Sequence, residues 1–365
     1  MCQTEVLTFN NFKFNKIMDK SRRHFLGVSA AALAGISVLP SLTSCAGAET
    51  KAAAPADGKV NSNFAGVAMG CITYSFRGTP GGLENLLGYC KNAGVSNLEL
   101  MGNDLEGCLG IPESPQQRLM AEARAAAEKA GQQIQGRIQL GPEAQAEMAK
   151  YQETVKAWRA NMDWDKVAEV RKRFNDLGID IHIVKTSPGA NSSDEDLDYA
   201  FKLAKAMGAP AVTTELSLDT AKRVAPFAEK HDMILAFHNH MQYATDEWKD
   251  GPDPVLAISP KIMLNFDQGH YFGSTGKHPV DFIKKYGDRI FSIHMKDKTG
   301  PDAQEPNANQ VWGQGQTPLE DLLHYIRDEK KPFYCDVELE YPVKPWSNAV
   351  KEVGTCINYA RQILL

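Results

Sequence analysis

The sequence predicts a single (β/α)8 barrel. Eight short runs rich in β-branched and aromatic residues alternate with helical patterns, which favours parallel strands joined by crossover helices over an antiparallel sandwich. From the third run onward most starts lie roughly 25 to 45 residues apart, enough for a strand, a loop and a helix. The eight runs are residues 67–74, 95–101, 179–185, 211–216, 233–240, 262–267, 290–295 and 333–340. Their number and spacing favour a closed barrel over an open doubly wound sheet.

The chain begins with the pattern of an export signal. Arg22-Arg23 precedes an apolar run over residues 25–39, which is too short to span a bilayer and is typical of a twin-arginine signal. The Leu-Thr-Ser-Cys run at 42–45 resembles a bacterial lipobox, in which Cys45 is lipidated and becomes the mature N-terminus. We therefore expect a periplasmic lipoprotein that meets the membrane only through its lipid anchor. The alternative is an ordinary Sec signal with a chance arginine pair and cysteine.

Three segments follow from these patterns. Residues 1–45 form the signal and lipobox, 46–63 an Ala-rich flexible tether, and 64–365 the barrel, which has about the size of one such domain. Because Met18 begins an ordinary signal n-region, we expect translation to start there and residues 1–17 to lie outside the protein.

The composition limits the possible partners. The formal net charge is -5 and 43% of the residues are hydrophobic, so no polyanion-binding surface is indicated and nucleic acid is not expected as a partner. The five cysteines after Cys45 form no CxxC pair, which favours buried free thiols, although an oxidising periplasm would permit one disulfide. The sequence leaves a homo-oligomer possible.

The interval between the second and third strands, residues 101–179, is unusually long. It contains two helical patterns, 114–130 and 143–177, so extra helices should cover one side of the barrel. The body contains no GxGxxG, GxxxxGK[ST] or GxSxG motif, so the usual signals of Rossmann, P-loop and α/β-hydrolase chemistry are missing.

Polar residues end the last four predicted strands. Because the active site of such a barrel lies at the carboxyl ends of its strands, these residues should meet there. Histidine together with carboxylate is the ligand set expected for Mn, Co, Zn or Fe, whereas Mg and Ca sites usually offer oxygen alone. A lone histidine at a strand end is more often structural, but four consecutive strands ending this way favour one divalent metal site. Its predicted ligands are His238, Asp267, His294 and Glu338.

Three motifs in this region resemble a known family. The Asp-Gln-Gly-His run at 267–270, the His-Met-Lys-Asp run at 294–297 and the Val-Glu-Leu-Glu run at 337–340 are similar to those of the xylose isomerase-like TIM-barrel superfamily. That superfamily comprises sugar phosphate isomerases/epimerases and includes inosose dehydratases. The resemblance covers most of the chain from about residue 67. It implies one metal held by the same four residues, with His270 and Lys296 in contact with substrate.

One residue departs from the epimerase branch of this superfamily. Those epimerases resemble the chain on strands six to eight, but they carry a glutamate where this sequence has His238. Their two metal-bound glutamates exchange a proton at one carbon, and His238 disfavours that symmetric mechanism. The Phe-His-Asn-His-Met run at 237–241 resembles the His-x-His-Met of the inosose dehydratase branch. This favours elimination or hydration.

The resemblance implies a mechanism with a base and an acid. A metal bound to a ketone and a neighbouring hydroxyl would act as a Lewis acid and stabilise the enediolate that forms when the α-proton is removed. Glu338, or Glu340 in another register, is the candidate base, and His240, His270 and Lys296 are candidate acids for the leaving oxygen. The structural alternatives are that Lys296 and Asp297 only pair with each other, and that Glu340 only orients a ligand.

Other residues are weaker candidates for binding substrate. Glu99, Lys185 and Glu215 end the second, third and fourth strands, and each has the alternative of a charge at the barrel rim. Tyr74, Arg77 and Trp312 could form a sugar-stacking and hydroxyl-binding rim, with a loop anchor as the alternative for Trp312.

The leading prediction is an exported, metal-dependent lyase or hydratase that acts on a keto-sugar or keto-glycoside. A sugar isomerase or epimerase with the same metal is the second, and a lipid-anchored sugar-binding protein without catalysis is the third. An abasic-site endonuclease fits poorly, because export would separate it from DNA and the charge does not favour phosphodiesters. Because phosphorylated sugars are mainly intracellular, a neutral carbohydrate is the expected substrate.

Overall fold

The computed structural model describes residues 58–130 and 139–365. The predicted signal, the lipobox with Cys45 and residues 46–57 of the predicted tether lie outside the described residues. In the part of the chain that is described, no helix combines the length and the apolar character needed to cross a membrane.

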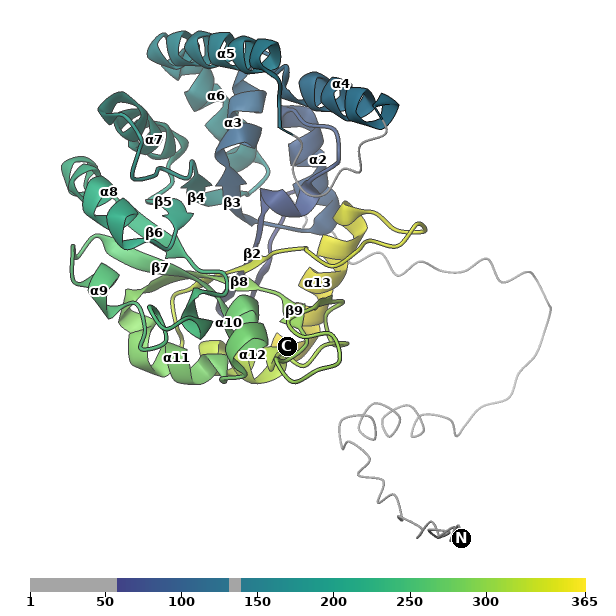
Figure 1. Cartoon of the computed structure of the whole chain (residues 1–365). Helices are drawn as coiled ribbons and strands as arrows, with labels where there is room; N and C mark the ends of the chain where they lie inside the picture. Colours follow the sequence, from purple (N-terminus) through teal and green to yellow (C-terminus); the bar gives the residue numbers. More distant parts are fainter. Residues whose placement is uncertain (1–57, 131–138) are drawn as a thin grey trace, which may run out of the picture. The chain divides into compact units, whose positions relative to one another are not determined.

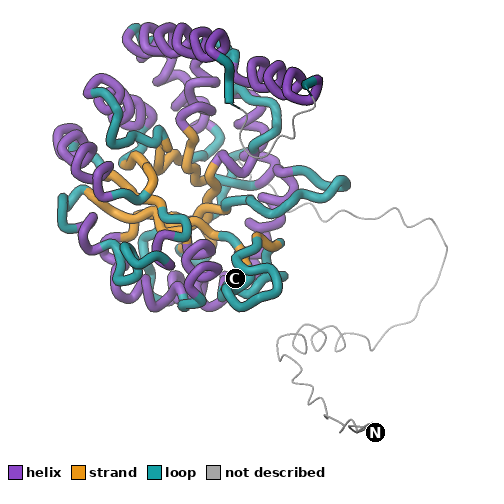
Figure 2. The backbone as a smooth tube through the Cα atoms, in the orientation of Figure 1, coloured by secondary structure: helices purple, strands orange, loops and turns teal. Residues whose placement is uncertain are grey.

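Eight parallel strands close into a barrel (Figures 1 and 2). The ring follows chain order, and it closes because the last strand pairs with the first. The predicted (β/α)8 barrel is therefore confirmed. The strands are β2 (Val67–Ile72), β3 (Asn97–Met101), β4 (Asp180–Lys185), β5 (Ala211–Glu215), β6 (Ile234–His238), β7 (Ile262–Asp267), β8 (Ile290–Met295) and β11 (Tyr334–Val337).

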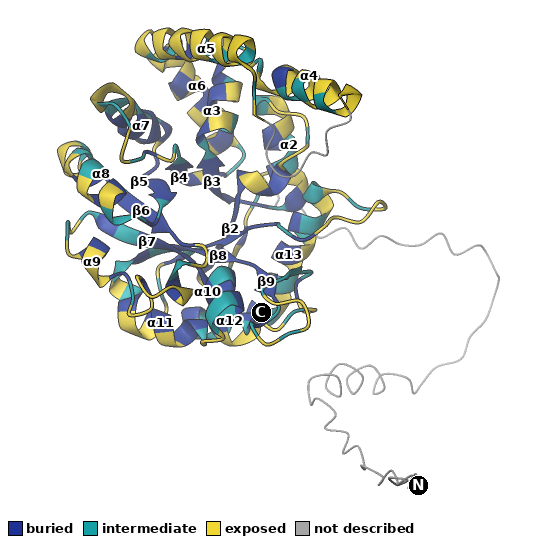
Figure 3. Cartoon of the chain, in the orientation of Figure 1, coloured by how far each residue is buried: buried dark blue, intermediate teal, exposed yellow. Residues whose placement is uncertain are grey.

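Helices surround this barrel and bury their inward faces against it (Figure 3). In α12 (Leu319–Asp328) the buried residues are Leu319, Leu322, Leu323 and Ile326, a helical spacing that places them on one face. The other helices of the ring are α2 (Leu83–Ala93), α7 (Asp194–Met207), α8 (Leu218–His231), α9 (Asp253–Leu256), α10 (Gln268–Thr275), α11 (Pro279–Tyr286) and α13 (Ala349–Leu364). Short 3-10 turns occur at η1 (Thr73–Phe76), η2 (Gln242–Ala244) and η3 (Gly287–Arg289).

Extra helices fill the long interval after β3, as predicted. They are α3 (Gly102–Leu109), α4 (Gln116–Lys129), α5 (Pro142–Ala160) and α6 (Trp164–Asp176). The predicted helical pattern 143–177 is two helices rather than one, because the Asp163 side chain caps α6 by accepting the N–H groups of Asp165 and Lys166. Helices α4 and α5 are mostly exposed and form an outer layer (Figure 3).

The barrel begins earlier than the predicted boundary at residue 64. The Val60 N–H donates to the Leu177 carbonyl, and β1 (Asn63–Phe64) pairs antiparallel with β2. Ser62 is fully buried and its hydroxyl donates to the Met69 carbonyl at 2.5 Å. Residues 60–63, which the predicted boundary leaves in the tether, therefore pack on the barrel.

The five described cysteines are all free thiols. Four of them are buried, and Cys108 is partly exposed. The free-thiol interpretation is therefore confirmed for this part of the chain, and the alternative of a disulfide is wrong there.

Gly70 in β2 permits close packing inside the barrel. A Cβ atom at this position would lie 2.2 Å from Asp336 Oδ1 and 2.8 Å from the Asn97 carbonyl oxygen. We expect Gly70→Ala to lower the free energy of unfolding by about 1 to 3 kcal/mol, because backbone or a buried carboxylate must move.

Gly88→Ala is the matched control for Gly70→Ala. Gly88 lies inside α2, where an added Cβ would meet nothing within 4 Å. It should raise the free energy of unfolding by about 0.5 to 1 kcal/mol, because alanine is the better helix former. Urea denaturation measures both values, and equal effects of the two variants would contradict the packing argument.

Candidate metal centre

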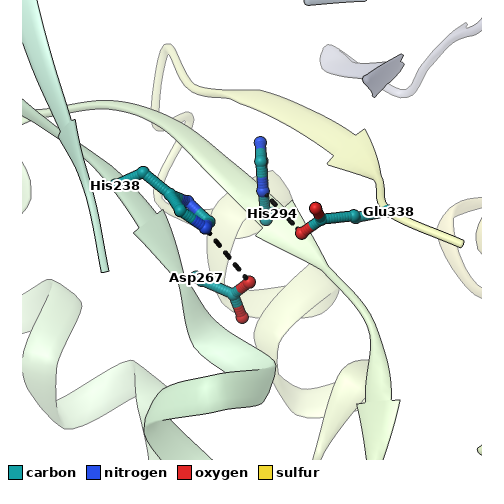
Figure 4. Close-up of side chains that lie close together, drawn as sticks. All are labelled: His238, Asp267, His294 and Glu338. Carbon is teal, nitrogen blue, oxygen red and sulfur yellow. Dashed lines mark hydrogen bonds and ion pairs between the residues drawn. The ribbon is translucent and has the colours of Figure 1, made fainter. Parts of the chain in front are cut away.

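Four buried side chains meet at the carboxyl ends of neighbouring strands. His238, Asp267, His294 and Glu338 each offer one ligand atom, and these atoms all lie within 4.8 Å of one another. Figure 4 shows the four side chains converging from separate strands. The structure thus brings together all four predicted ligands.

Parallel pairing explains why these residues meet. Asp267 of β7 lies opposite His294 of β8, so equivalent strand ends arrive at the same level. Glu338 follows the end of β11, but its N–H still donates to the Met295 carbonyl at 3.2 Å. The Asn239 side chain holds the backbone of Asp267 through both the N–H and the carbonyl. The ligand positions are therefore set by the sheet and by one amide side chain.

Lys296 supplies the positive charge beside the carboxylates. Its Nζ lies 2.8 Å from Asp267 Oδ2, 2.7 Å from Glu338 Oε2 and 2.8 Å from Glu340 Oε2. Burial alone would lower the pKa of Lys296, but these carboxylates raise it above its ordinary value. The alternative that Lys296 pairs only with Asp297 is wrong. Asp297 instead accepts N–H groups from the loop after β10 (Asn309–Gln310). Strand β10 itself pairs with β9 (Asp297–Lys298).

His294 lies between two carboxylates. Its Nδ1 is 2.8 Å from Glu338 Oε2, and its Nε2 is 2.8 Å from Glu99 Oε2. Burial would lower the pKa of His294, but Glu99 and Glu338 raise it well above the ordinary value. The prediction that Glu99 binds substrate at the strand end is not supported. Glu99 lies inside β3 with 0% exposure and contacts His294 instead.

The residues of this cluster fit one divalent cation. Two imidazoles and two carboxylates form a donor set typical of Mn, Co, Zn or Fe. Burial, with Lys185 and His294 nearby, lowers the pKa of His238 well below its ordinary value, whereas the pKa of His294 is raised, so a cation would have to displace a proton from His294. His238 Nε2 lies 4.0 Å from Asp267 Oδ2, so this nitrogen faces the cluster. Lys296 contacts two of the same carboxylates, so a bound cation would compete with its ammonium group.

A second group of charges borders the cluster. His240 Nε2 lies 2.9 Å from Glu215 Oε2, and Lys185 Nζ lies 3.0 Å from Glu215 Oε1. The ring of His240, half-exposed, is 4.8 Å from that of His238 between centroids. Burial would raise the pKa of Glu215, but His240 and Lys185 lower it to about 2. The predicted residues Lys185, Glu215 and His240 are therefore linked beside the ligand set.

His270 and Glu340 lie beside Asp267, and the ring of His270 is 5.1 Å from that of His240 between centroids. His270 Nε2 is 3.6 Å from Glu340 Oε2 and 3.9 Å from Asp267 Oδ2. Burial lowers the pKa of His270 to about 4, so its ring is neutral at neutral pH. The structure therefore places His270 and Glu340 next to Lys296 and the metal ligands.

Tyr74 and Arg77 border a cavity of about 580 Å³ at the end of β2. The Arg77 guanidinium stacks over the Tyr74 ring at 4.6 Å, and it donates to the Leu339 carbonyl just after Glu338. A neighbouring cavity of about 400 Å³ includes Lys185, and both cavities share Met101 and Asn103. Two hollows thus adjoin along the ends of β2 to β4.

Trp312 packs away from solvent. It is 6% exposed, and its ring meets Tyr359 of α13 edge-on with centroids 5.9 Å apart. This placement favours the loop-anchor alternative over a sugar-stacking role.

Four further buried polar residues were not predicted. Asn239 and Asn265 contact Asp267 and His294, and His182 pairs with Asp336 at 2.8 Å inside the barrel. Asn265 and Asp336 each lie two positions before a predicted ligand, so strand alternation extended inward would have placed them on the same face. No comparable signal marks His182.

A closed parallel barrel with a buried cluster of histidines and carboxylates at the carboxyl ends of its strands is the architecture of the TIM-barrel class. The family model of the xylose isomerase-like TIM barrel matches residues 87–357, and the chain belongs to this family. This confirms the resemblance that the three motifs indicate.

Curated relatives match over a short region. The chain is 29% identical over 85 residues to an inosose dehydratase from Clostridium beijerinckii, which is 23% of this chain and 28% of that protein. It is 30% identical over 77 residues to an inosose dehydratase from Clostridium botulinum, which is 20% of this chain and 25% of that protein. The chain thus spans about a quarter of the length of these relatives.

Solved structures match over most of the chain. A xylose isomerase domain protein from Alicyclobacillus acidocaldarius has a TM-score of 0.53 at 14% identity, covering 81% of this chain and 98% of that chain. The probable 3-DHS dehydratase AsbF from Bacillus anthracis gives 0.52 at 15% identity over 80% and 97%. D-psicose 3-epimerase from Clostridium cellulolyticum gives 0.50 at 10% identity over 82% and 99%. At these identities the likeness shows the fold alone.

Removing the Glu215 carboxylate should change the titration of His240. The hydrogen bond with Glu215 raises the pKa of His240 above its ordinary value. The folded protein therefore binds this proton more tightly than the unfolded chain. The resulting stabilisation is full below a pH of about 6.5 and is lost as the pH rises through the raised pKa.

We expect Glu215→Gln to lower the pKa of His240 in the folded protein. NMR titration of the histidine ring protons measures this value, with His278, whose ring contacts Asp321 rather than Glu215, as an internal reference. An unchanged His240 titration would show that Glu215 does not hold the proton there.

Proposed function

We propose that the protein is a divalent-metal-dependent lyase or hydratase that acts on a keto-sugar or keto-glycoside. The observation that carries this proposal is the buried cluster of His238, Asp267, His294 and Glu338, in which a histidine ends β6 opposite the glutamate after β11. One carboxylate and one imidazole cannot exchange a proton symmetrically. The inosose dehydratase relatives support the same reaction class.

The chemistry divides between a base and an acid. A divalent ion in the cluster would act as a Lewis acid on the substrate carbonyl. Glu338 is the base that takes the proton from the carbon next to the carbonyl. Its contacts with His294 and Lys296 both use Oε2, which leaves Oε1 to face substrate. The C–H electrons form a C=C bond as the C–O bond on the next carbon breaks.

His240 is the acid that protonates the departing oxygen. Glu215 raises the pKa of His240, so the ring retains a proton closer to neutral pH, and its half-exposed position allows contact with substrate. His270, with a pKa of about 4, is neutral and serves as a hydrogen-bond partner instead. In the hydration direction the same two groups exchange roles and water adds to the C=C bond.

Of the two proposed substrate classes, the keto-glycoside is supported by space along the ends of β2 to β4. The cavity of about 400 Å³ is lined by Lys185, which contacts Glu215, and the adjoining cavity of about 580 Å³ is lined by exposed Tyr74 and by Arg77. An aromatic ring flanked by polar side chains suits a sugar, because it offers both apolar and hydrogen-bonding surface.

Metal content and activity on keto-glycosides test this function. We expect Asp267→Ala to lose stoichiometric metal and at least about 10²-fold in kcat/KM on keto-glycosides, because a buried ligand of the catalytic centre is removed. Asp246→Ala is the matched control, because Asp246 lies at the surface with a side chain 99% exposed. Metal analysis and deuterium uptake from D₂O are the measurements.

Two outcomes would replace this proposal. Clean epimerisation without loss or gain of water would identify an isomerase or epimerase that uses the same site. Wild-type protein without metal, together with unchanged sugar binding in Asp267→Ala, would identify a binding protein without catalysis.

We also propose that the protein is exported folded and anchored through lipid on Cys45. The twin arginine Arg22-Arg23 and the run at 42–45 support this location. Folded export suits a site that takes its metal in the cytoplasm.

Replacing Arg22 and Arg23 with lysine should leave the protein in the cytoplasm, as cell fractionation would measure. Cys45→Ser, the control, should still be exported but appear in the soluble periplasmic fraction. Unchanged export of the double lysine variant would indicate an ordinary Sec signal.

A further inference from the structure

We propose that Glu99 is a positioning residue that makes His294 a metal ligand through Nδ1. This inference rests on the metal site of the proposed function and adds a residue that is not itself a ligand. Glu99 and His294 come from strands far apart in sequence, and their contact crosses the interior of the barrel.

The contacts show which ring nitrogen faces the ligand cluster. Both nitrogens lie 2.8 Å from a carboxylate oxygen, Nε2 from Glu99 Oε2 and Nδ1 from Glu338 Oε2, and an ionised carboxylate can only accept hydrogen bonds. Of these two carboxylates only Glu338 belongs to the predicted ligand set, so a cation in the cluster would replace the proton on Nδ1, while Glu99 would still accept the proton on Nε2. Figure 4 shows one nitrogen of His294 next to Glu338 and the other pointing away from the cluster. A metal would therefore meet Nδ1.

Asn265 completes this arrangement. Its Nδ2 donates to Glu99 Oε2 at 2.7 Å. Nδ2 lies 3.2 Å from His294 Nε2, because both donors approach the same carboxylate oxygen. The reverse amide orientation would direct Oδ1 at the carboxylate, and two acceptors repel each other. One carboxylate oxygen thus receives two donors and fixes both side chains.

The strand pairing is irregular next to both Glu99 and Asn265. The pairing of β3 with β4 shifts register between Leu98 and Glu99, and that of β7 with β8 shifts between Leu264 and Asn265. Such irregularities redirect side chains next to functional sites. Both partners of His294 Nε2 therefore follow a register shift.

Packing alone does not explain Glu99. The residue is 0% exposed, and its Oε1 atom has no hydrogen-bond partner among the described residues. A buried carboxylate with one unsatisfied oxygen destabilises a fold. Next to a metal ligand such a carboxylate has a role, because it orients the ligand and raises its basicity.

The barrel contains a matched control. Asp336 is also 0% exposed and also bonds a histidine, since its Oδ2 lies 2.8 Å from His182 Nε2. His182 is not a metal ligand. Glu99, His294 and Asp336 also offer ligand atoms within 4.8 Å of one another, so either a general effect of removing a buried carboxylate or an ion held by that group would appear in Asp336→Asn as well.

The first experiment measures Zn²⁺ affinity. Glu99→Gln should weaken Zn²⁺ binding by about 10- to 100-fold in competition with a chelator, whereas Asp336→Asn should stay within about threefold of wild type. Circular dichroism and thermal melting of the metal-free proteins monitor folding. Equal affinities of wild type and Glu99→Gln overturn the inference, as do equal losses in both variants.

The second experiment does not depend on a variant that folds. Long-range ¹H–¹⁵N spectra of the Zn²⁺-loaded wild type, labelled on histidine, report which nitrogen of His294 binds the ion. Coordination through Nδ1 with a proton on Nε2 supports the inference, and coordination through Nε2 overturns it. Wild type that binds no Zn²⁺ overturns both this inference and the metal site of the proposed function, whereas Zn²⁺ binding through Nε2 leaves that site intact.

Discussion

The mouth of the barrel depends on neutralising buried carboxylates. Asp267 and Glu338 are buried and face one interior point, and Lys296 bridges both of them to Glu340. Unpaired charges there would be costly in a medium of low dielectric. The two residues after Asp267 help to position Lys296. Gln268 donates to the Lys296 carbonyl, and a Cβ at Gly269 would lie 2.2 Å from Lys296 Cγ. In the Asp-Gln-Gly-His run, Asp267 thus caps α10, Gln268 binds the backbone just after β8, and Gly269 leaves room for the Lys296 side chain.

Below this mouth lies a second polar layer. His182 stacks on Tyr334 with centroids 4.0 Å apart and pairs with Asp336, and Glu99 links this depth to His294 above. Barrel interiors are usually filled by branched apolar side chains. In this barrel polar groups lie below the candidate ligands instead. Their contacts limit the motion of the ligand side chains.

The sequence predicts the strands and the meeting of the four candidate ligands well, because both follow local rules. Period-two alternation and the parallel barrel bring strand ends together wherever the register is regular. The sequence predicts Glu99 as a substrate-binding residue at a strand end, because the register shift beside it cannot be recognised in a single sequence. The partners of Lys296 were missed for a related reason, since three carboxylates from two strands compete for one ammonium group. The packing of Trp312 against Tyr359 could not be predicted from the sequence, because it depends on where α13 lies in the fold.

The two sides of the mouth differ chemically. The β4 to β6 side presents Lys185, Glu215 and His240, an imidazole that holds a proton, whereas the β8 and β11 side presents Glu338 with Lys296. Exchange of one proton at one carbon works best with equivalent groups on opposite faces. A proton acceptor on one side and a proton donor on the other suit a reaction in which the carbon that loses hydrogen and the oxygen that gains it are different atoms. This division favours elimination or hydration over epimerisation, independently of which sugar occupies the adjoining cavities.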